Sequence, residues 1–268
     1  MYIMDGFFHF FLNRLDALRK CFPTAVTSKE DCVSLIKKIS PVSPGIELIR
    51  LGPAGDGGYL LPNDLSDIEA CFSPGVSNIS GFEKDCADMG MKVFLADGTI
   101  EAPVLQHTNF MFLKKNIGVT ASNTIERIED WVLSSPISAT TDLLLQMDIE
   151  GSEYGVFLDT PESLLKRFRI MVVEFHSLNM LFCDSFFQLA VAMFEKILQH
   201  HTCVHLHPNN CCGIVKMHGI EIPITMEFTF LRNDRFRNRS PARIPSPLDT
   251  DNVPNNNSLK LSPIWVSG

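Results

Sequence analysis

The stretch that decides the fold is Leu143-Leu-Leu-Gln-Met-Asp-Ile-Glu-Gly-Ser-Glu-Tyr154, an apolar run followed at once by three carboxylates and a glycine. A short run that is almost entirely apolar is typical of a strand buried on both faces of a parallel sheet. Carboxylates this close together repel one another, which can raise a pKa, and such groups gather at functional sites. We therefore expect a buried strand that opens into a reactive cleft, with Asp148 as its first candidate.

Similar runs before and after this stretch predict a sheet. The other expected strands are Ile68–Phe72, Lys92–Ala96, Ile170–Phe175, Cys203–His207, Gly213–Lys216 and Ile224–Leu231. Helical patterns separate most of them, and this alternation is the signature of an α/β protein. Ile224–Leu231 alternates between apolar and polar residues, which favours an edge or antiparallel strand. We predict a Rossmann-like α/β fold with a seven-stranded, mostly parallel sheet, one antiparallel strand and helices on both faces.

The flanking regions differ from this central part. We expect a helical extension over residues 1–45, with an amphipathic helix over Met1–Leu15 that packs on the main domain, which spans residues 46–232. Residues 233–268 form a polar tail, rich in Arg, Pro, Asn and Ser, that packs on the domain and docks through Ile264-Trp265-Val266. The arginines of the tail are either solvated or form a phosphate-binding patch.

Composition narrows the class of function. The chain has 268 residues and a net charge of -8, from 31 acidic and 23 basic residues, which argues against a partner that is a nucleic acid or an anionic membrane. Its apolar stretches are too short for stable membrane insertion. The eight cysteines show no CxxC pair and no zinc spacing. We expect reduced thiols, no disulfide between the adjacent Cys211 and Cys212, and a cytoplasmic location.

A candidate nucleotide-binding turn follows the first sheet strand, in Cys71-Phe-Ser-Pro-Gly-Val-Ser-Asn78. Gly75 allows a ligand to approach the backbone, and the helix that begins near Ser80 offers free N–H groups. Asp97 ends the next strand about 20 residues later, a separation at which an acid reaches the ribose hydroxyls of an adenosine cofactor. The alternatives are an ordinary turn and a solvated aspartate. The candidate cofactor-binding residues here are Ser73, Gly75, Val76, Ser77, Asn78, Asp97 and Gly98.

Catalytic candidates end two of the predicted strands. If Leu143–Met147 and Ile170–Phe175 are neighbours, Asp148, Glu174 and His176 share one cleft. The alternative is that these groups cap helices or pair with nearby arginines. Asp148 and Glu174 are also hard oxygen donors that could bring a divalent cation to the reaction, although we assign no resident metal.

Two further motifs have an ambiguous role. Gly55-Asp-Gly-Gly-Tyr59 indicates a hairpin, which is either structural or a flap that brings Tyr59 over a ligand. The histidines at 200, 201, 205 and 207 either support the fold or bind a metal, and we favour the structural interpretation.

The order of these motifs resembles the FkbM-type methyltransferases, which belong to the class I group that uses S-adenosylmethionine. The resemblance runs from about Arg50 to Leu231 and is strongest in Gln146-Met-Asp-Ile-Glu-Gly-Ser-Glu-Tyr154; Gly55–Tyr59 and His207-Pro-Asn-Asn210 add to it. It implies a class I methyltransferase fold and O-methylation of a small-molecule, sugar or lipid hydroxyl. It also implies that Gly75 and its neighbours line the methionine part of the cofactor, Asp97 holds the ribose, and Asp148 and Glu150 lie at the reaction cleft.

Two positions depart from that pattern. Class I methyltransferases usually have an acid two residues before the first motif glycine, where this chain has Ser73, and Ser77 replaces a second glycine. Glu83, a water molecule or Tyr59 could replace the missing carboxylate. Two other functions stay open: a methyltransferase-like fold that only binds ligands, and an NAD-dependent oxidoreductase, although the G-x-G-x-x-G spacing is absent.

Overall fold

The computed structural model describes residues 24–266, and its centre is a seven-stranded sheet in the order β11-β14-β10-β9-β4-β5-β6. Its strands are β4 (Ala70–Pro74), β5 (Lys92–Ala96), β6 (Phe110–Leu113), β9 (Leu143–Met147), β10 (Phe168–Phe175), β11 (His201–Pro208) and β14 (Met226–Arg232). The pairs from β6 to β10 are parallel, whereas β14 runs antiparallel to both β10 and β11. The predicted α/β fold, with a mostly parallel sheet and one antiparallel strand, is confirmed.

One of the seven strands was not predicted, and one predicted strand lies outside this sheet. Phe110–Leu113 was not expected, yet it forms β6 at the edge of the sheet. The segment predicted at Gly213–Lys216 instead belongs to a separate two-stranded hairpin, β12 (Ile214–Met217) with β13 (Ile220–Pro223). The reason is burial: β12 is largely exposed, and its apolar side chains resemble those of a core strand only in the sequence.

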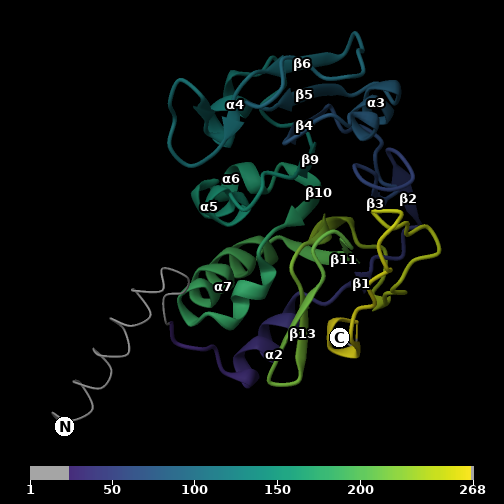
Figure 1. Cartoon of the computed structure of the whole chain (residues 1–268). Helices are drawn as coiled ribbons and strands as arrows, with labels where there is room; N and C mark the ends of the chain where they lie inside the picture. The colour runs from purple at the N-terminus through teal and green to yellow at the C-terminus, as the bar shows by residue number, and fades with distance from the viewer. Residues whose placement is uncertain (1–23, 267–268) are drawn as a thin grey trace, which may run out of the picture.

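The two faces of the sheet are covered by different elements (Figure 1). One face packs on helices α4 (Ile128–Ser134), α5 (Glu153–Asp159), α6 (Glu162–Leu165) and α7 (Asp184–Leu198). The other packs on α3 (Gly81–Asp88) and on the hairpin of β2 (Leu48–Leu51) and β3 (Tyr59–Pro62). Helices therefore lie on both faces, as predicted, but the hairpin covers part of the second. We call these the helical face and the hairpin face.

The flanking regions contact this body. Helix α2 (Lys29–Lys38) begins at Ser28, whose hydroxyl accepts from the Asp31 N–H, and β1 (Val42–Ser43) pairs with β15 (Ser240–Pro241) of the tail. Trp265, in the 3-10 helix η3 (Pro263–Trp265), is fully buried and donates from Nε1 to the Glu221 carbonyl. Docking of the predicted tail segment is thus observed, while the division at residues 45 and 232 stays a prediction. The helix predicted over Met1–Leu15 lies outside the described residues.

The remaining described elements are short. They are β7 (Asn116–Ile117), β8 (Ile125–Glu126), and the 3-10 helices η1 (Leu178–Phe182) and η2 (Asn233–Arg235). The expectation of separate thiols at Cys211 and Cys212 was wrong, because their sulfurs are joined in a disulfide within the turn after β11. Among residues 24–266, none of the helices has the length and apolar character needed to cross a membrane.

Candidate functional site

The candidate site lies where the strand order reverses. From β4 the chain adds β5 and β6 on one side, then crosses to add β9 and β10 on the other. In open α/β sheets a crevice forms at this switch point, outside the carboxyl ends of the strands, and ligands bind there. Gly75 directly follows β4 and Asp148 directly follows β9, so the two segments singled out in the sequence meet at this point.

Gly75 is needed for the approach of these two segments. The Asp148 N–H donates to the Pro74 carbonyl over 3.1 Å, and the Gly75 N–H donates to the Ala96 carbonyl over 2.8 Å. Gly75 has φ +87°, and a Cβ atom there would lie 1.5 Å from the Asp148 carbonyl oxygen. The glycine therefore serves first to join the strand ends closely, and the crevice is built on that joint.

Asp97 holds the turn that faces it. Its Oδ1 accepts from the Thr99 N–H and hydroxyl, and its Oδ2 accepts from the Ser77 N–H over 2.8 Å. Burial raises its pKa, but these hydrogen bonds outweigh burial and keep the pKa of Asp97 below its usual value. A carboxylate offers about four acceptor positions. The Ser77 and Thr99 donors use three of them, and a hydrogen bond from the Ile100 N–H also helps to lower the pKa, so Asp97 is largely engaged by its own turn.

Asp148, Glu174 and His176 come together as predicted. His176 Nε2 lies 3.8 Å from Asp148 Oδ1 and 3.4 Å from Glu174 Oε1. Its Nδ1 lies 3.2 Å from Oε1 of Glu153, a fully buried residue that also accepts from the Gly151 N–H. Glu153 therefore fixes the imidazole so that Nε2 faces the two carboxylates. One oxygen or nitrogen from each of the three predicted residues lies within 4.8 Å of the others, close enough to share one cation.

Burial and mutual repulsion shift the protonation of this group. Burial and the Glu174 charge raise the pKa of Asp148 to about 8, and burial and the Glu227 charge raise that of Glu174 to about 8. Burial opposes a charge on His176, but Glu153 and the two other carboxyls outweigh it and raise its pKa to about 9. The cluster therefore holds protons near neutral pH and can exchange one with a ligand.

A buried polar chain lies beside Asp148. The Ser73 hydroxyl lies 2.5 Å from Glu83 Oε1 and 2.6 Å from Gln146 Oε1, and Gln146 Nε2 donates to the Tyr59 hydroxyl over 3.2 Å. Since Ser73 has one hydroxyl hydrogen, it donates to one of its two neighbours at a time. Burial raises the pKa of Glu83 to about 7, so a protonated Glu83 can supply the other hydrogen.

Two neighbouring cavities share Gly75, Ser77 and Asp148 as lining residues. The larger measures about 480 Å³ and is also lined by Ala96, Asp97, Thr99, Asn116, Ile117, Gly118, Ile125, Ile149, Glu150 and Ser152. The smaller measures about 50 Å³ and is also lined by Asp56, Gly57, Tyr59, Val76, Ile79, Glu83 and Gln146. We call them the large lobe and the small lobe.

Some predicted residues lie away from the lobes. Asn78 is exposed and lines neither. Gly98 contributes indirectly, because its N–H donates to Asn116 Oδ1 over 2.9 Å and so positions a lining residue. Glu174 and His176 line neither lobe, although His176 Nε2 lies 3.8 Å from Asp148 Oδ1. His205 Nε2 lies 2.9 Å from Asp249 Oδ1, and His207 Nδ1 lies 3.7 Å from it, which supports the structural interpretation of these histidines.

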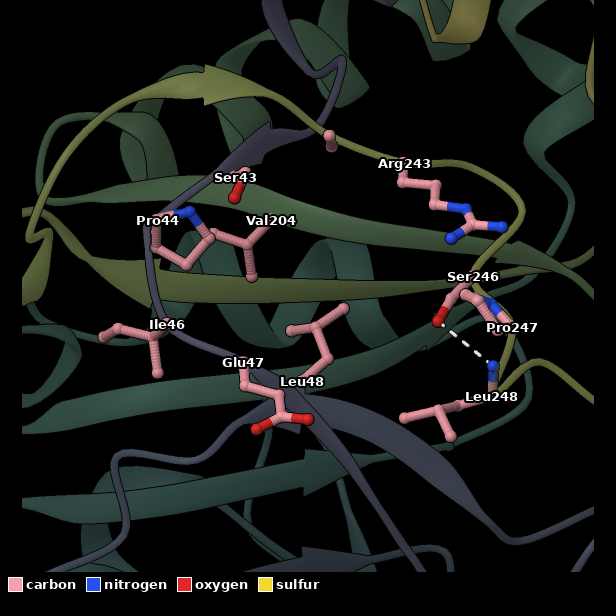
Figure 2. Close-up of a pocket in the computed structure, with 11 residues that line it drawn as sticks. Ser43, Pro44, Ile46, Glu47, Leu48, Val204, Arg243, Ser246, Pro247 and Leu248 are labelled. Atoms are coloured by element: carbon pink, nitrogen blue, oxygen red, sulfur yellow. Dashed lines mark hydrogen bonds between the residues drawn. The ribbon is translucent and has the colours of Figure 1, made fainter.

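A separate cavity of about 400 Å³ lies between residues 43–48 and tail residues 242–248, with Val204 of β11 between them (Figure 2). The Leu248 N–H donates to the Ser246 hydroxyl over 3.2 Å at its edge. Arg243 of the tail lines this cavity, but none of the predicted catalytic or cofactor-binding residues does, so the switch point is the stronger candidate.

Sequence reasoning missed several contributors to the site. Asn209 donates from Nδ2 to both oxygens of Glu174 at 3.2 Å, and Glu153 orients His176. Gln146 was visible as the polar residue inside an otherwise apolar strand, and this signal could have been used. Asp56 and Asn209 lie in the two stretches that add to the family resemblance, but sequence reasoning assigned neither a role, since only the tertiary fold brings them to the site.

Comparisons with known proteins add little to this geometry. No family model matches the chain, and no curated protein matches it. Among solved structures, the chain is similar to a Pyrococcus horikoshii protein classed provisionally as an RNA methyltransferase. The TM-score is 0.34 at 11% identity, covering 63% of this chain and 77% of that one. A likeness of this size carries no argument about function, so the functional conclusion rests on the residues of the site.

Proposed function

We propose that this chain is an S-adenosylmethionine-dependent methyltransferase that acts on a hydroxyl of a small molecule, sugar or lipid. The observation that carries the proposal is the large lobe at the switch point, which both Asp97 and Asp148 line. It puts an acceptor for a ribose hydroxyl and a carboxyl with a raised pKa into one cavity.

The lining residues fit this cofactor. Ile117, Ile125 and Ile149 offer apolar walls to a flat base, and the Asp97 carboxylate lines the same lobe, where an acid would meet a ribose hydroxyl. The buried Asp148 Oδ1 has no hydrogen-bond partner among residues 24–266, so a polar ligand group is expected beside it. When bound, S-adenosylmethionine supplies a methyl group on a good leaving group.

The role of the chain itself is to orient the acceptor, exclude water and take a proton. Asp148 is the better base, because a carboxyl with a pKa near 8 is matched to neutral pH and its Oδ1 accepts no hydrogen bond from residues 24–266. His176, which holds its proton more firmly, acts as the neighbouring positive charge that Glu153 keeps in position. From these roles we expect His176→Ala to lower turnover and Asp148→Asn to abolish it.

Calorimetric titration with S-adenosylmethionine, S-adenosylhomocysteine and NADH tests the proposal. Micromolar binding of the two sulfur nucleosides, weakened by about 10-fold or more in Asp97→Ala, would support it. Asp159→Ala, which removes a carboxylate that pairs with Arg127 outside both lobes, serves as the control and should bind normally.

Other outcomes favour the alternatives. Binding of NADH alone would support the oxidoreductase. Tight binding of the sulfur nucleosides, with no methyl transfer to any hydroxyl acceptor, would support a methyltransferase-like fold that only binds ligands. Turnover that survives treatment with a chelator would show that the reaction needs no divalent cation at the Asp148 cluster.

A further inference from the structure

The turn after β11 carries the disulfide between Cys211 and Cys212. Both cysteines are exposed, whereas Cys183 is half-buried and the remaining cysteines of residues 24–266 are buried. Exchange of a disulfide requires a thiolate to reach one of its sulfurs. Among the described cysteines, this pair is therefore the one most open to a thiol from outside the chain.

The backbone of this pair is linked to the catalytic candidates through Asn209. The Cys211 N–H donates to Asn209 Oδ1 over 2.9 Å, and Asn209 Nδ2 donates to both oxygens of Glu174 at 3.2 Å. Asn209 is only 4% exposed, so its amide is held inside the fold. A change in the backbone at Cys211 therefore reaches Glu174 through one side chain.

The same turn holds the tail through Asn210. Asn210 Nδ2 donates to the Val253 carbonyl over 2.9 Å, and its Oδ1 accepts from the Val253 N–H over 2.8 Å. Asn252, the neighbour of Val253, donates to Oε1 of the buried Glu227 over 2.8 Å. Both Glu174 and Glu227 are thus contacted by side chains that this turn helps to position.

The disulfide restrains the turn through covalent geometry. A bond between the sulfurs of adjacent residues closes a small ring that contains the peptide bond joining them, so the backbone of Cys211 and Cys212 cannot rotate freely. Fixing the backbone of a residue removes conformational entropy, and opening the ring returns it. Reduction should therefore loosen the turn, and with it the links to Glu174 and to the tail.

We propose that Cys211 and Cys212 are a redox-modification site through which a dithiol reductant controls the turn that contacts Glu174. One thiolate of the reductant attacks a sulfur of the pair, which breaks the S–S bond and forms a mixed disulfide. The second thiol of the reductant then displaces the protein sulfur. The reductant leaves as a disulfide, two electrons pass to the pair, and the two protons of the reductant's thiols end on the cysteine sulfurs. Exchange with an oxidised dithiol runs the reaction backwards.

The site is independent of the ligand that occupies the lobes, so its test is separate from that of the proposed function. Dithiothreitol is the reductant, and the wild-type protein is first purified without it. Peptide mapping should find Cys211 and Cys212 blocked to iodoacetamide in this protein and alkylated after reduction.

Two measurements then report on the turn and on the tail. Hydrogen–deuterium exchange in residues 208–213 should be about 5-fold faster in the reduced protein, with β5 unchanged. Trypsin should cleave after the exposed Lys260 of the tail about 5-fold faster. Cleavage after the exposed Lys114, which follows the strand at the opposite edge of the sheet from β11, should not change and is the internal control.

The double variant Cys211→Ser/Cys212→Ser separates this pair from the other cysteines. It should resemble the reduced protein and should not respond to dithiothreitol. Cys183→Ser is the matched control, because Cys183 lies at the start of α7 and outside the turn, and it should keep the wild-type response.

Three results would overturn the site. The first is alkylation of Cys211 and Cys212 without reductant, which would mean that there is no disulfide to reduce. The second is equal exchange and equal cleavage in the oxidised and reduced wild-type proteins. The third is a response of the double variant to dithiothreitol as large as that of the wild-type protein. The wild-type comparison needs no substitution, so it tests the site even if the double variant does not fold.

Discussion

The two faces of the central sheet are formed by the same strands, but one buries mainly apolar side chains and the other also buries carboxyl groups. On the helical face, alternate residues of β10 and β14 are apolar, and Phe175, Phe194 and Phe228 pack with ring centroids 5.1–5.7 Å apart. On the hairpin face, the intervening positions include Glu174 and Glu227, which are cross-strand partners. One face therefore stabilises the fold, whereas the other stores unfavourable electrostatic energy next to the site.

This polar character extends across the hairpin face. Ser73, Gln146, Glu174, Glu227 and His207 come from five different strands, and all are buried. His207 pairs in register with Glu227, and Glu227 pairs with Glu174. A row of polar side chains thus leads along the sheet towards the switch point. The contrast between the faces teaches that a functional face can be recognised by where the apolar alternation of buried strands is broken.

The largest expected effect is on the helical face. Phe228→Ala removes a fully buried ring from the aromatic cluster, and we expect the free energy of unfolding to fall by about 3–5 kcal/mol. Urea denaturation followed by circular dichroism measures it. A loss below about 1 kcal/mol would mean that the helical face is not the stabilising one.

The neighbouring residue, Glu227, tests the hairpin face through pH. Burial raises its pKa from 4.5 to about 8, so the folded state holds more protons than the unfolded state between these values. Stability should therefore fall as pH rises through this window. Glu227→Gln should match the wild-type protein near pH 4, below the unfolded pKa, and exceed it by about 1–3 kcal/mol at pH 8.

Glu69 gives a control of opposite sign for that experiment. Hydrogen bonds from Thr141 and Lys92 lower the pKa of Glu69 to about 2, so its contribution is present above pH 4.5 and is lost as pH falls through about 2. Glu69→Gln should therefore lose stability at neutral pH. If thermal melts show both variants moving in the same direction at pH 8, the contrast between the two carboxyls is wrong.

The sequence alone predicted the buried strands better than the edges. β9 and β10 were identified because nearly every residue in them is apolar, and their shared direction then brought Asp148, Glu174 and His176 together. β6 was missed although Phe110–Leu113 is entirely apolar, because a run of four residues is too short for periodicity to identify it as a strand.

The contacts of the site that the sequence did not predict have a physical explanation as well. Glu83 reaches Ser73 only because α3 turns this carboxyl toward the end of β4, and Asn209 reaches Glu174 only because β14 lies between β10 and β11. Neither contact can be deduced from spacing along the chain. Periodicity locates the ends of strands, but the packing of helices and loops decides which polar groups meet there.

The smallest expected effect separates two adjacent residues, Asn209 and Asn210. Asn209 donates to Glu174, whereas Asn210 donates from Nδ2 to the Val253 carbonyl and accepts from the Val253 N–H, which ties down the tail. Each alanine variant should cost about 1 kcal/mol of stability. Only Asn209→Ala should raise the pKa of Glu174 further, because the donated hydrogen bonds lower it. The decline of stability with pH should then move to higher pH in this variant alone.

Asn210→Ala should instead keep the wild-type pH profile and expose the tail to proteases, since Val253 is no longer held. Thermal melts from pH 5 to 9 and limited proteolysis distinguish the two effects. If both variants shift the pH profile equally, Asn209 acts by holding the turn after β11 in place, and its bonds to Glu174 are incidental. A shift confined to Asn209→Ala would instead mean that the loop after β11 sets the protonation of the hairpin face, so that the site depends on a segment outside the switch point.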